Sequence, residues 1–219
     1  MDFKTIPKKV FRKLKSFGMS QEKKPAMKAF KEAVATLQKS DIAIDCGANV
    51  GEFTRLMAKT GATVYAFEPN PIAYQELLKN TVNFPNVKAI QAAVTAKVGL
   101  VRLHLHEWAD KDPLHWSTGS SLLSYKSNVL EDQFIEVEGV QLSKFIKELN
   151  MPVRLLKMDI EGAEVELLNH LLDQELYRSI NQAFVEVHDR KIPELVQPTT
   201  QLRKRIETLG INHFRLDWH

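Results

Sequence analysis

Short apolar runs and longer amphipathic segments take turns along this chain from residue 41 onward. An apolar run of roughly four to eight residues predicts a buried strand, whereas apolar residues spaced three or four apart predict a helix. Their alternation predicts an α/β domain with a mostly parallel sheet and helices on both of its faces. The predicted strands are 42–46, 63–67, 87–94, 100–106, 134–141, 153–159, 180–188 and 211–217. The predicted helices are 51–60, 71–83, 142–149, 162–176 and 195–208.

The first 40 residues are predicted to form a basic helical extension, 1–40, to a main domain that spans residues 41–219. The extension carries eleven Lys or Arg against three acids, whereas the main domain carries nineteen against twenty-four. An apolar stripe at helical spacing predicts an amphipathic helix that ends at Gly18, and Pro25 marks the start of a second helix. The stripe consists of Phe3, Ile6, Val10, Leu14 and Phe17. Either residues 1–18 contact an anionic membrane surface or an acidic partner, or the stripe packs on the main domain or on a second copy.

The composition of the chain is that of an ordinary globular domain. Its 219 residues are 44% hydrophobic and 26% charged, which suits one domain with a substantial core. No run approaches the ~18–20 apolar residues that cross a bilayer, and the single cysteine, Cys46, fits a reducing compartment. We therefore expect a cytoplasmic protein. Because the main domain is mildly acidic, we expect no nucleic-acid partner, since phosphate binding requires clustered cations.

The segment 42–54 predicts a nucleotide-cofactor site. An apolar strand ends in Asp45, and a turn with Gly47 and Gly51 follows it. About twenty residues further on, a second apolar strand is followed by Glu68. This is the layout of the first βαβ unit of nucleotide-binding folds, in which the second acid holds ribose hydroxyls. The alternative is an ordinary strand–turn–helix corner whose glycines serve geometry alone.

The details of this turn favour S-adenosylmethionine over a dinucleotide. A dinucleotide site requires a Gly-x-Gly-x-x-Gly pattern so that bare backbone approaches the pyrophosphate, but the second and third glycine positions are Asn49 and Glu52. A carboxylate in the first turn of the helix competes with a pyrophosphate for the same amide donors. S-adenosylmethionine carries no phosphate, and its cationic groups tolerate nearby acids. A nicotinamide-dependent oxidoreductase is therefore the alternative enzyme class.

Several sequence motifs resemble those of one protein family. "AIDCGANVGEFT", "VYAFEPNP", "LLKMDIEGAEVELL" and "FVEVH" follow one another between Asp41 and His188 in the order and spacing of the FkbM family of S-adenosylmethionine-dependent methyltransferases. The "GSSL" at 119–122 also resembles a stretch of those proteins, and the most specific element is the run Lys157-x-Asp159-x-Glu161-Gly-Ala-Glu. One departure is Leu142-Ser143-Lys144, where family members often have Leu-Asp.

The resemblance implies a Rossmann-like class I methyltransferase fold. Its mostly parallel sheet would have seven strands, the last of them reversed, and helices on both faces. The resemblance also implies that the acceptor is a hydroxyl oxygen on a sugar, a glycan or another small natural product. A non-catalytic interaction module that acts through the basic N-terminal helix is a further alternative, and we expect a monomer or a homodimer.

The predicted site residues should meet beyond the carboxyl ends of the strands, where open α/β sheets bind ligands. The residues expected to bind S-adenosylmethionine are Asp45, Gly47, Ala48, Asn49, Gly51, Thr54, Glu68 and Pro69. The residues expected to serve catalysis are Asp159, Glu161, His188 and Lys157. The long polar stretch 107–128 is expected to be either a lid over the site or a connector.

Methyl transfer to an alcohol requires removal of the hydroxyl proton, for which Asp159, Glu161 and His188 are candidate bases. Lys157 is expected to hold Asp159 ionised or to orient the acceptor. Each residue also has a structural interpretation: Asp159 as a helix cap or a ligand of the cofactor's ammonium, Glu161 as a partner of the helix dipole, and His188 as a partner of a loop. No spacing among the acids of this region singles out a metal geometry, so no metal is expected.

Overall fold

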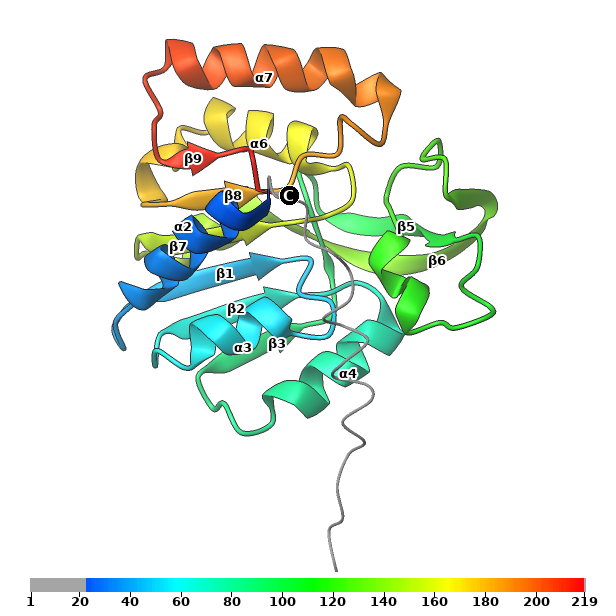
Figure 1. The fold of residues 1–219 in the computed structure, drawn as a ribbon, viewed down its shortest axis with the longest axis horizontal. Helices are drawn as coiled ribbons and strands as arrows, with labels where there is room; N and C mark the ends of the chain where they lie inside the picture. The colour runs from blue at the N-terminus through cyan, green and yellow to red at the C-terminus, as the bar shows by residue number, and fades with distance from the viewer. Residues whose placement is uncertain (1–22, 219) are drawn as a thin grey trace, which may run out of the picture.

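The computed structural model describes residues 23–218, so the predicted basic helix at 3–17 lies outside the described part of the chain. The strands are β1 (Ile42–Cys46), β2 (Thr63–Phe67), β3 (Val87–Ile90), β4 (Ala93–Thr95), β5 (Gly99–His106), β6 (Val129–Gln141), β7 (Val153–Met158), β8 (Ala183–Val185) and β9 (Phe214–Arg215). Six of them form the main sheet in the order β3-β2-β1-β7-β8-β9, with all neighbours parallel. The other three form a second sheet beside it, in the order β4-β6-β5 (Figure 1).

The predicted α/β class with a mostly parallel sheet is confirmed, but the expected seventh strand and reversed last strand are corrected. Within residues 23–218 the main sheet has six strands, and β9 runs parallel to β8 with Phe214 opposite Ala183. The connection explains this direction. The chain returns from β8 to β9 through a crossover helix, α7 (Val196–Thr208), which is the kind of connection that adjacent parallel strands require.

The predicted strand 87–94 contributes to both sheets. A turn in which the Ala92 amide donates to the Ile90 carbonyl (3.0 Å) separates β3 from β4. β4 pairs with β6, which also pairs with β5 in an antiparallel hairpin. Residues 107–128 connect β5 to β6 and include the short 3₁₀ helix η1 (His115–Gly119). The second sheet therefore stands at one side of the main sheet, close to the carboxyl ends of its strands (Figure 1).

Helices cover both faces of the main sheet, as predicted. The remaining helices are α2 (Lys23–Ala35), α3 (Glu52–Ala58), α4 (Pro71–Thr81), α5 (Leu142–Leu149) and α6 (Glu164–Asp173), with the 3₁₀ helices η2 (Leu176–Ser179) and η3 (Pro193–Leu195). Side chains alternate along each strand. On β1, Ile42, Ile44 and Cys46 join the core under α5, α6 and α7, whereas Ala43 joins the core under α2 and α3. Cys46 is a fully buried member of this core, and burial raises the pKa of its thiol.

The helix α2 packs directly on the main sheet. Its Phe30 is fully buried, and its ring contacts the rings of Phe53, Phe184 and Trp218 at centroid distances of 5.4, 5.3 and 5.1 Å. Burial of an aromatic side chain of this size contributes about 1.5–3 kcal/mol. The second helix of the basic extension is thus part of the same core as the main domain. In the described residues, no helix combines the length and the apolar character needed to span a membrane.

Candidate active site

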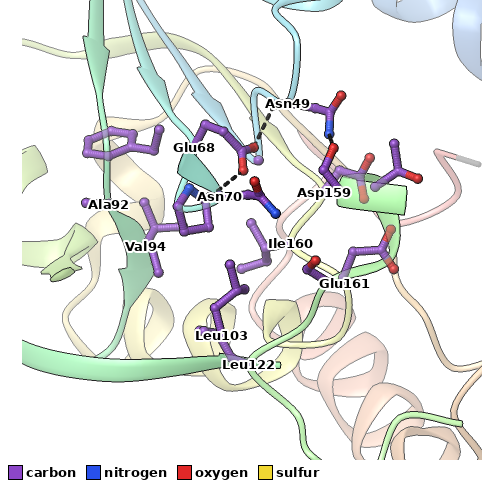
Figure 2. A pocket seen from close by; sticks show the side chains of 17 residues that line it. Asn49, Glu68, Asn70, Ala92, Val94, Leu103, Leu122, Asp159, Ile160 and Glu161 are labelled. Carbon is purple, nitrogen blue, oxygen red and sulfur yellow. Dashed lines mark hydrogen bonds between the residues drawn. The ribbon is translucent and has the colours of Figure 1, made fainter. Parts of the chain in front are cut away.

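A pocket lies at the carboxyl ends of β1, β2 and β7, where the main sheet faces the second sheet (Figure 2). Four of the residues predicted to bind the cofactor line it: Gly47, Asn49, Glu68 and Pro69. Apolar side chains form the opposite wall, among them Val94, Leu103, Leu122 and Ile160. The carboxylates of Asp159 and Glu161 stand at the far end (Figure 2). The pocket therefore combines an apolar wall with acids at both ends.

The turn after β1 approaches the end of β7 so closely that only glycine fits at position 47. Gly47 has φ +76°, and a Cβ atom there would lie 1.8 Å from the carbonyl oxygen of Asp159. The Asp159 amide in turn donates to the Cys46 carbonyl at 3.0 Å. Gly51, at φ +84°, begins α3 and lies against Leu77, to which a Cβ atom would approach within 2.6 Å. The glycines predicted from the sequence thus serve the close packing of this turn.

Glu68 joins the turn after β1 to the turn after β2. One of its carboxylate oxygens accepts a hydrogen bond from the Asn49 amide (2.7 Å) and the other accepts one from the Asn70 amide (2.8 Å), as Figure 2 shows. The side chain is almost completely buried. Burial raises the pKa of Glu68 to about 7, although the two backbone donors oppose the rise. Each oxygen keeps a lone pair that can accept a further hydrogen bond.

Asp45 lies behind the pocket and does not line it. Its side chain is fully buried, accepts a hydrogen bond from Thr54 Oγ1 (2.6 Å), and lies 3.2 Å from the ammonium of Lys157. Lys157 also donates to the carbonyl oxygen of Gly47 at 2.7 Å. Burial alone would lower the pKa of Lys157, but Asp45 and Asp159 raise it above its ordinary value. These buried groups fix the shape of the turn after β1 from behind.

The other four residues predicted to bind the cofactor do not line the pocket. Ala48, Gly51 and Thr54, like Asp45, belong to the turn and the start of α3 without lining the pocket. They shape the turn that presents Asn49, whose side chain donates to Ser117 Oγ at 3.1 Å. Sequence reasoning missed Asn70, although the Asn-Pro pair at 70–71 is a signal for a helix cap. The Asn70 side chain indeed caps α4, and its amide binds Glu68.

Asp159 and Glu161 present carboxylates to the pocket, with side chains that are 29% and 21% exposed. Burial raises the pKa of Asp159 to about 7; Lys157 opposes this rise, and the nearby carboxylates of Glu186 and Glu161 add to it. Burial alone would raise the pKa of Glu161, but its contacts with His188 and Lys126 lower it to about 2. The ammonium of Lys126, itself buried, lies 2.6 Å from Glu161 Oε2.

His188 lies beneath these two carboxylates and is 1% exposed. Its Nε2 is 3.3 Å from Glu161 Oε2 and 3.8 Å from Asp159 Oδ1, and its Nδ1 is 3.0 Å from Glu164 Oε1. Burial alone would lower the pKa of His188, but contacts with Glu161 and Glu164 raise it to about 10. The ring does not line the pocket. Its role as a general base stays a prediction, and this geometry favours a role in positioning the carboxylates.

Glu164 organises the loop that carries Glu161. Its fully buried carboxylate accepts hydrogen bonds from the amides of Ile160 and Gly162, both at 2.9 Å, and contacts His188. Glu161 itself has φ +58°, an uncommon conformation for a residue with a side chain. No sequence signal marks this contact, because His188 and Glu164 are 24 positions apart.

The stretch 107–128 forms one wall of the pocket. Its Ser121 hydroxyl donates to the Glu161 carbonyl (2.6 Å), and its Lys126 donates to the Gly119 carbonyl (2.8 Å). A second hollow is lined by His106, Trp116, Asn128 and Lys191 among others. It shares Thr118 and Glu161 with the first pocket. Ser117, Thr118, Ser120 and Leu122 of this stretch thus line the pocket, whereas its role as a lid or a connector stays a prediction.

The sequence is similar to known methyltransferases. Residues 45–211 match the family model described as the methyltransferase FkbM domain. Methyltransferase sdnD of Sordaria araneosa is 24% identical in an alignment that covers 84% of this chain and 80% of sdnD. The 31-O-demethyl-FK506 methyltransferase FkbM of Streptomyces tacrolimicus is 29% identical in an alignment that covers 70% of this chain and 67% of that protein. The 2-O-methyltransferase NoeI of Sinorhizobium fredii is 24% identical in an alignment that covers 65% of this chain and 63% of NoeI.

Solved structures are less similar. An rRNA methylase from Streptococcus thermophilus aligns with a TM-score of 0.46 and 10% identity over 83% of this chain and 81% of its own. This likeness is too slight to bear on function. The family model, in contrast, spans residues 45–211, which include every residue that lines the pocket. The chain therefore belongs to the FkbM methyltransferase family.

Proposed function

We propose that this protein transfers the methyl group of S-adenosylmethionine to a hydroxyl oxygen of a sugar, a glycan or another small natural product. The observation that supports this best is the position of Glu68 at one end of the pocket, with Asp159 and Glu161 at the other. One end suits a ribose, and the other suits an acceptor hydroxyl. The family and the pocket thus point to the same reaction.

The residues of the pocket fit S-adenosylmethionine. Glu68 holds lone pairs for the two ribose hydroxyls, and the Asn49 amide fixes its carboxylate. The apolar side chains of Val94, Leu103 and Leu122 suit the adenine ring. When bound, the cofactor supplies an electrophilic methyl group on a sulfonium, whose positive charge the nearby acids tolerate. A pyrophosphate, in contrast, would meet the carboxylates of Glu68, Asp159 and Glu161 in a pocket whose described lining includes no lysine or arginine.

The acceptor hydroxyl is placed at the Asp159–Glu161 end of the pocket. The protein must align the hydroxyl with the methyl group, exclude water, and let the hydroxyl proton leave at this end. Asp159 and Glu161 are the groups that contact the acceptor, whereas Lys157 and His188, which are almost fully buried, hold these carboxylates in place.

The acceptor class follows from two observations. The names of NoeI and of the FK506 enzyme both specify methylation at oxygen, the first at a 2-O position. The second hollow also includes Glu161, and its lining by His106, Trp116 and Asn128 offers aromatic and hydrogen-bonding groups. Such a lining suits a small polyhydroxylated molecule better than a large apolar one.

The proposal is tested by ligand binding and by label transfer. S-adenosylhomocysteine should raise the melting temperature by several degrees, whereas NAD should not, because only a ligand of the native state stabilises it. Glu68→Gln should remove the shift, and Glu76→Gln, a carboxylate on the exposed side of α4, should keep it. Incubation with methyl-labelled cofactor and a host extract, followed by mass spectrometry, should then label a hydroxylated small molecule or glycan. Stabilisation by NAD alone, or label in no oxygen-bound methyl group, would overturn the proposal.

A further inference from the structure

Three side chains converge at the acceptor end of the pocket with the chemistry of a metal site. One ligand atom from each of Asp159, Glu161 and His188 can be chosen so that all three lie within 4.8 Å of one another. The imidazole Nε2 is 3.3 Å from Glu161 Oε2 and 3.8 Å from Asp159 Oδ1. Atoms bound to one cation at about 2.1–2.3 Å are separated by distances of this order. The sequence did not reveal the set, because His188 lies 27 positions after Glu161.

His188 supplies a second, independent observation. It is 1% exposed, and neither of its ring nitrogens makes a hydrogen bond of good geometry within the described part of the chain. Its Nδ1 faces the fully buried carboxylate of Glu164 at 3.0 Å, which leaves Nε2 directed at Asp159 and Glu161. A carboxylate behind one ring nitrogen is the usual way in which a protein orients a histidine toward a metal.

Glu164 is itself held rigidly for such a role. Its two oxygens accept the amides of Ile160 and Gly162, so the carboxylate fixes the Glu161 loop and the His188 ring together. Glu164 therefore orients both His188 and the loop that carries Glu161. An ion pair between His188 and Glu161 would not by itself require a third residue that positions both of them.

We propose that Asp159, Glu161 and His188 bind one hard divalent cation, of the class of Mg²⁺ or Mn²⁺. The two carboxylates supply the oxygen ligands that these ions prefer. Histidine binds a metal as the neutral imidazole, so binding at Nε2 requires that nitrogen to be free of a proton. Asp159 and Glu161 line the pocket, so the open coordination positions face the acceptor.

The role of the cation rests on the proposed function, although its binding does not. A bound cation would hold the acceptor hydroxyl and make it more acidic. The acceptor oxygen then forms its bond to the methyl carbon, the sulfur–carbon bond breaks with its electron pair left on sulfur, and the hydroxyl proton passes to water. Lys126, which contacts Glu161, keeps that carboxylate ionised and in place.

The test is binding of Mn²⁺ to the purified, chelator-treated full chain without cofactor or acceptor. Electron paramagnetic resonance should show one saturable site, from which Mg²⁺ displaces Mn²⁺. Glu161→Gln and His188→Gln should each weaken binding at least tenfold, and Glu164→Gln, which acts through His188, about 10–100-fold. Glu166→Gln, an exposed carboxylate on the same helix as Glu164, is the matched control and should bind as the wild type does.

Circular dichroism and a cooperative thermal unfolding transition without ligand show whether each variant is folded. Where Glu161→Gln fails this check, Asp159→Asn replaces it. Absence of saturable Mn²⁺ binding by the wild type, unchanged binding in the variants, or binding of Zn²⁺ with none of Mn²⁺ or Mg²⁺ would each overturn the inference. Mn²⁺ binding without a response to S-adenosylhomocysteine would instead keep the metal site and contradict the proposed function.

Discussion

Asp45 on β1 and Lys157 on β7 are register partners on adjacent parallel strands, and their charged groups lie 3.2 Å apart in the interior. The side chain of Asp45 is 0% exposed and that of Lys157 is 2% exposed. Lys157 also donates a hydrogen bond to the Gly47 carbonyl, and Asp45 accepts one from the hydroxyl of Thr54 in the first turn of α3. This pair therefore links two central strands to the turn that lines the pocket.

Replacement of Lys157 by Met should strongly destabilise the fold. The change leaves the buried carboxylate of Asp45 without its counter-charge, at a cost of about 3–5 kcal/mol. Urea unfolding of wild type and variant measures this loss. Lys144→Met, which removes an exposed ion pair with Glu148, should cost less than about 1 kcal/mol. Equal effects of the two substitutions would contradict a special role for the buried pair.

The affinity for S-adenosylhomocysteine should increase with pH around neutrality. Burial raises the pKa of Glu68 to about 7, and only the ionised carboxylate accepts hydrogen bonds from both ribose hydroxyls. The ionised fraction rises about tenfold between pH 6 and pH 8, so the dissociation constant should fall by about the same factor. Calorimetric titration at several pH values measures it. Glu68→Gln should bind weakly and without this pH dependence, and the same slope in that variant would assign the effect to another group.

Gly47→Ala should damage both the fold and the pocket. The residue has φ +76°, and an added Cβ would meet the Asp159 carbonyl at 1.8 Å, so we expect a loss of more than ~2 kcal/mol and loss of cofactor binding. Gly210→Ala is the matched control. It also has a positive φ, +66°, but no atom lies within 4 Å of the added Cβ, so it should cost only about 1 kcal/mol and keep the pocket intact.

Ser121→Ala should lower both the stability of the fold and the rate of methyl transfer. Ser121 is fully buried, and its hydroxyl donates to the Glu161 carbonyl at 2.6 Å. Its removal should cost about 1–3 kcal/mol and loosen the Glu161 loop, which lowers the rate of methyl transfer at saturating cofactor. Thr200→Ala, whose exposed hydroxyl also donates to a backbone carbonyl, should change neither quantity measurably. An unchanged transfer rate in Ser121→Ala would show that the loop does not need this bond.

The sequence predicted the central elements well because their signals are local. The strands 42–46 and 63–67 and the helix 142–149 have the bounds expected, since a buried apolar run or an amphipathic period marks each of them. The start of β6 at Val129 was missed, because residues 130–134 are exposed and carry no apolar alternation. The split of 87–94 between two sheets depends on a turn that no residue type signals.

In the candidate site, too, the sequence predicted what local signals mark and missed contacts between distant positions. Glu68 was identified from its place after the second strand, and Gly47 from its place in the turn. The contact of Lys126 with Glu161 joins residues 35 positions apart, and Glu164 and His188 meet across 24 positions. Sequence spacing therefore indicated which residues reach the carboxyl edge of the sheet, but not which of them touch.

The two walls of the pocket belong to separate sheets. The Glu68 wall is built on the main sheet, whereas the opposite wall comes largely from the β5–β6 hairpin and its 22-residue connection, 107–128. The connection supplies Leu122 to the apolar wall, and its Ser117 accepts a hydrogen bond from the Asn49 side chain beside Glu68. Its Ser121 and Lys126 contact Glu161 at the other end of the pocket. A change in the length of this one surface segment would therefore alter both ends of the pocket together.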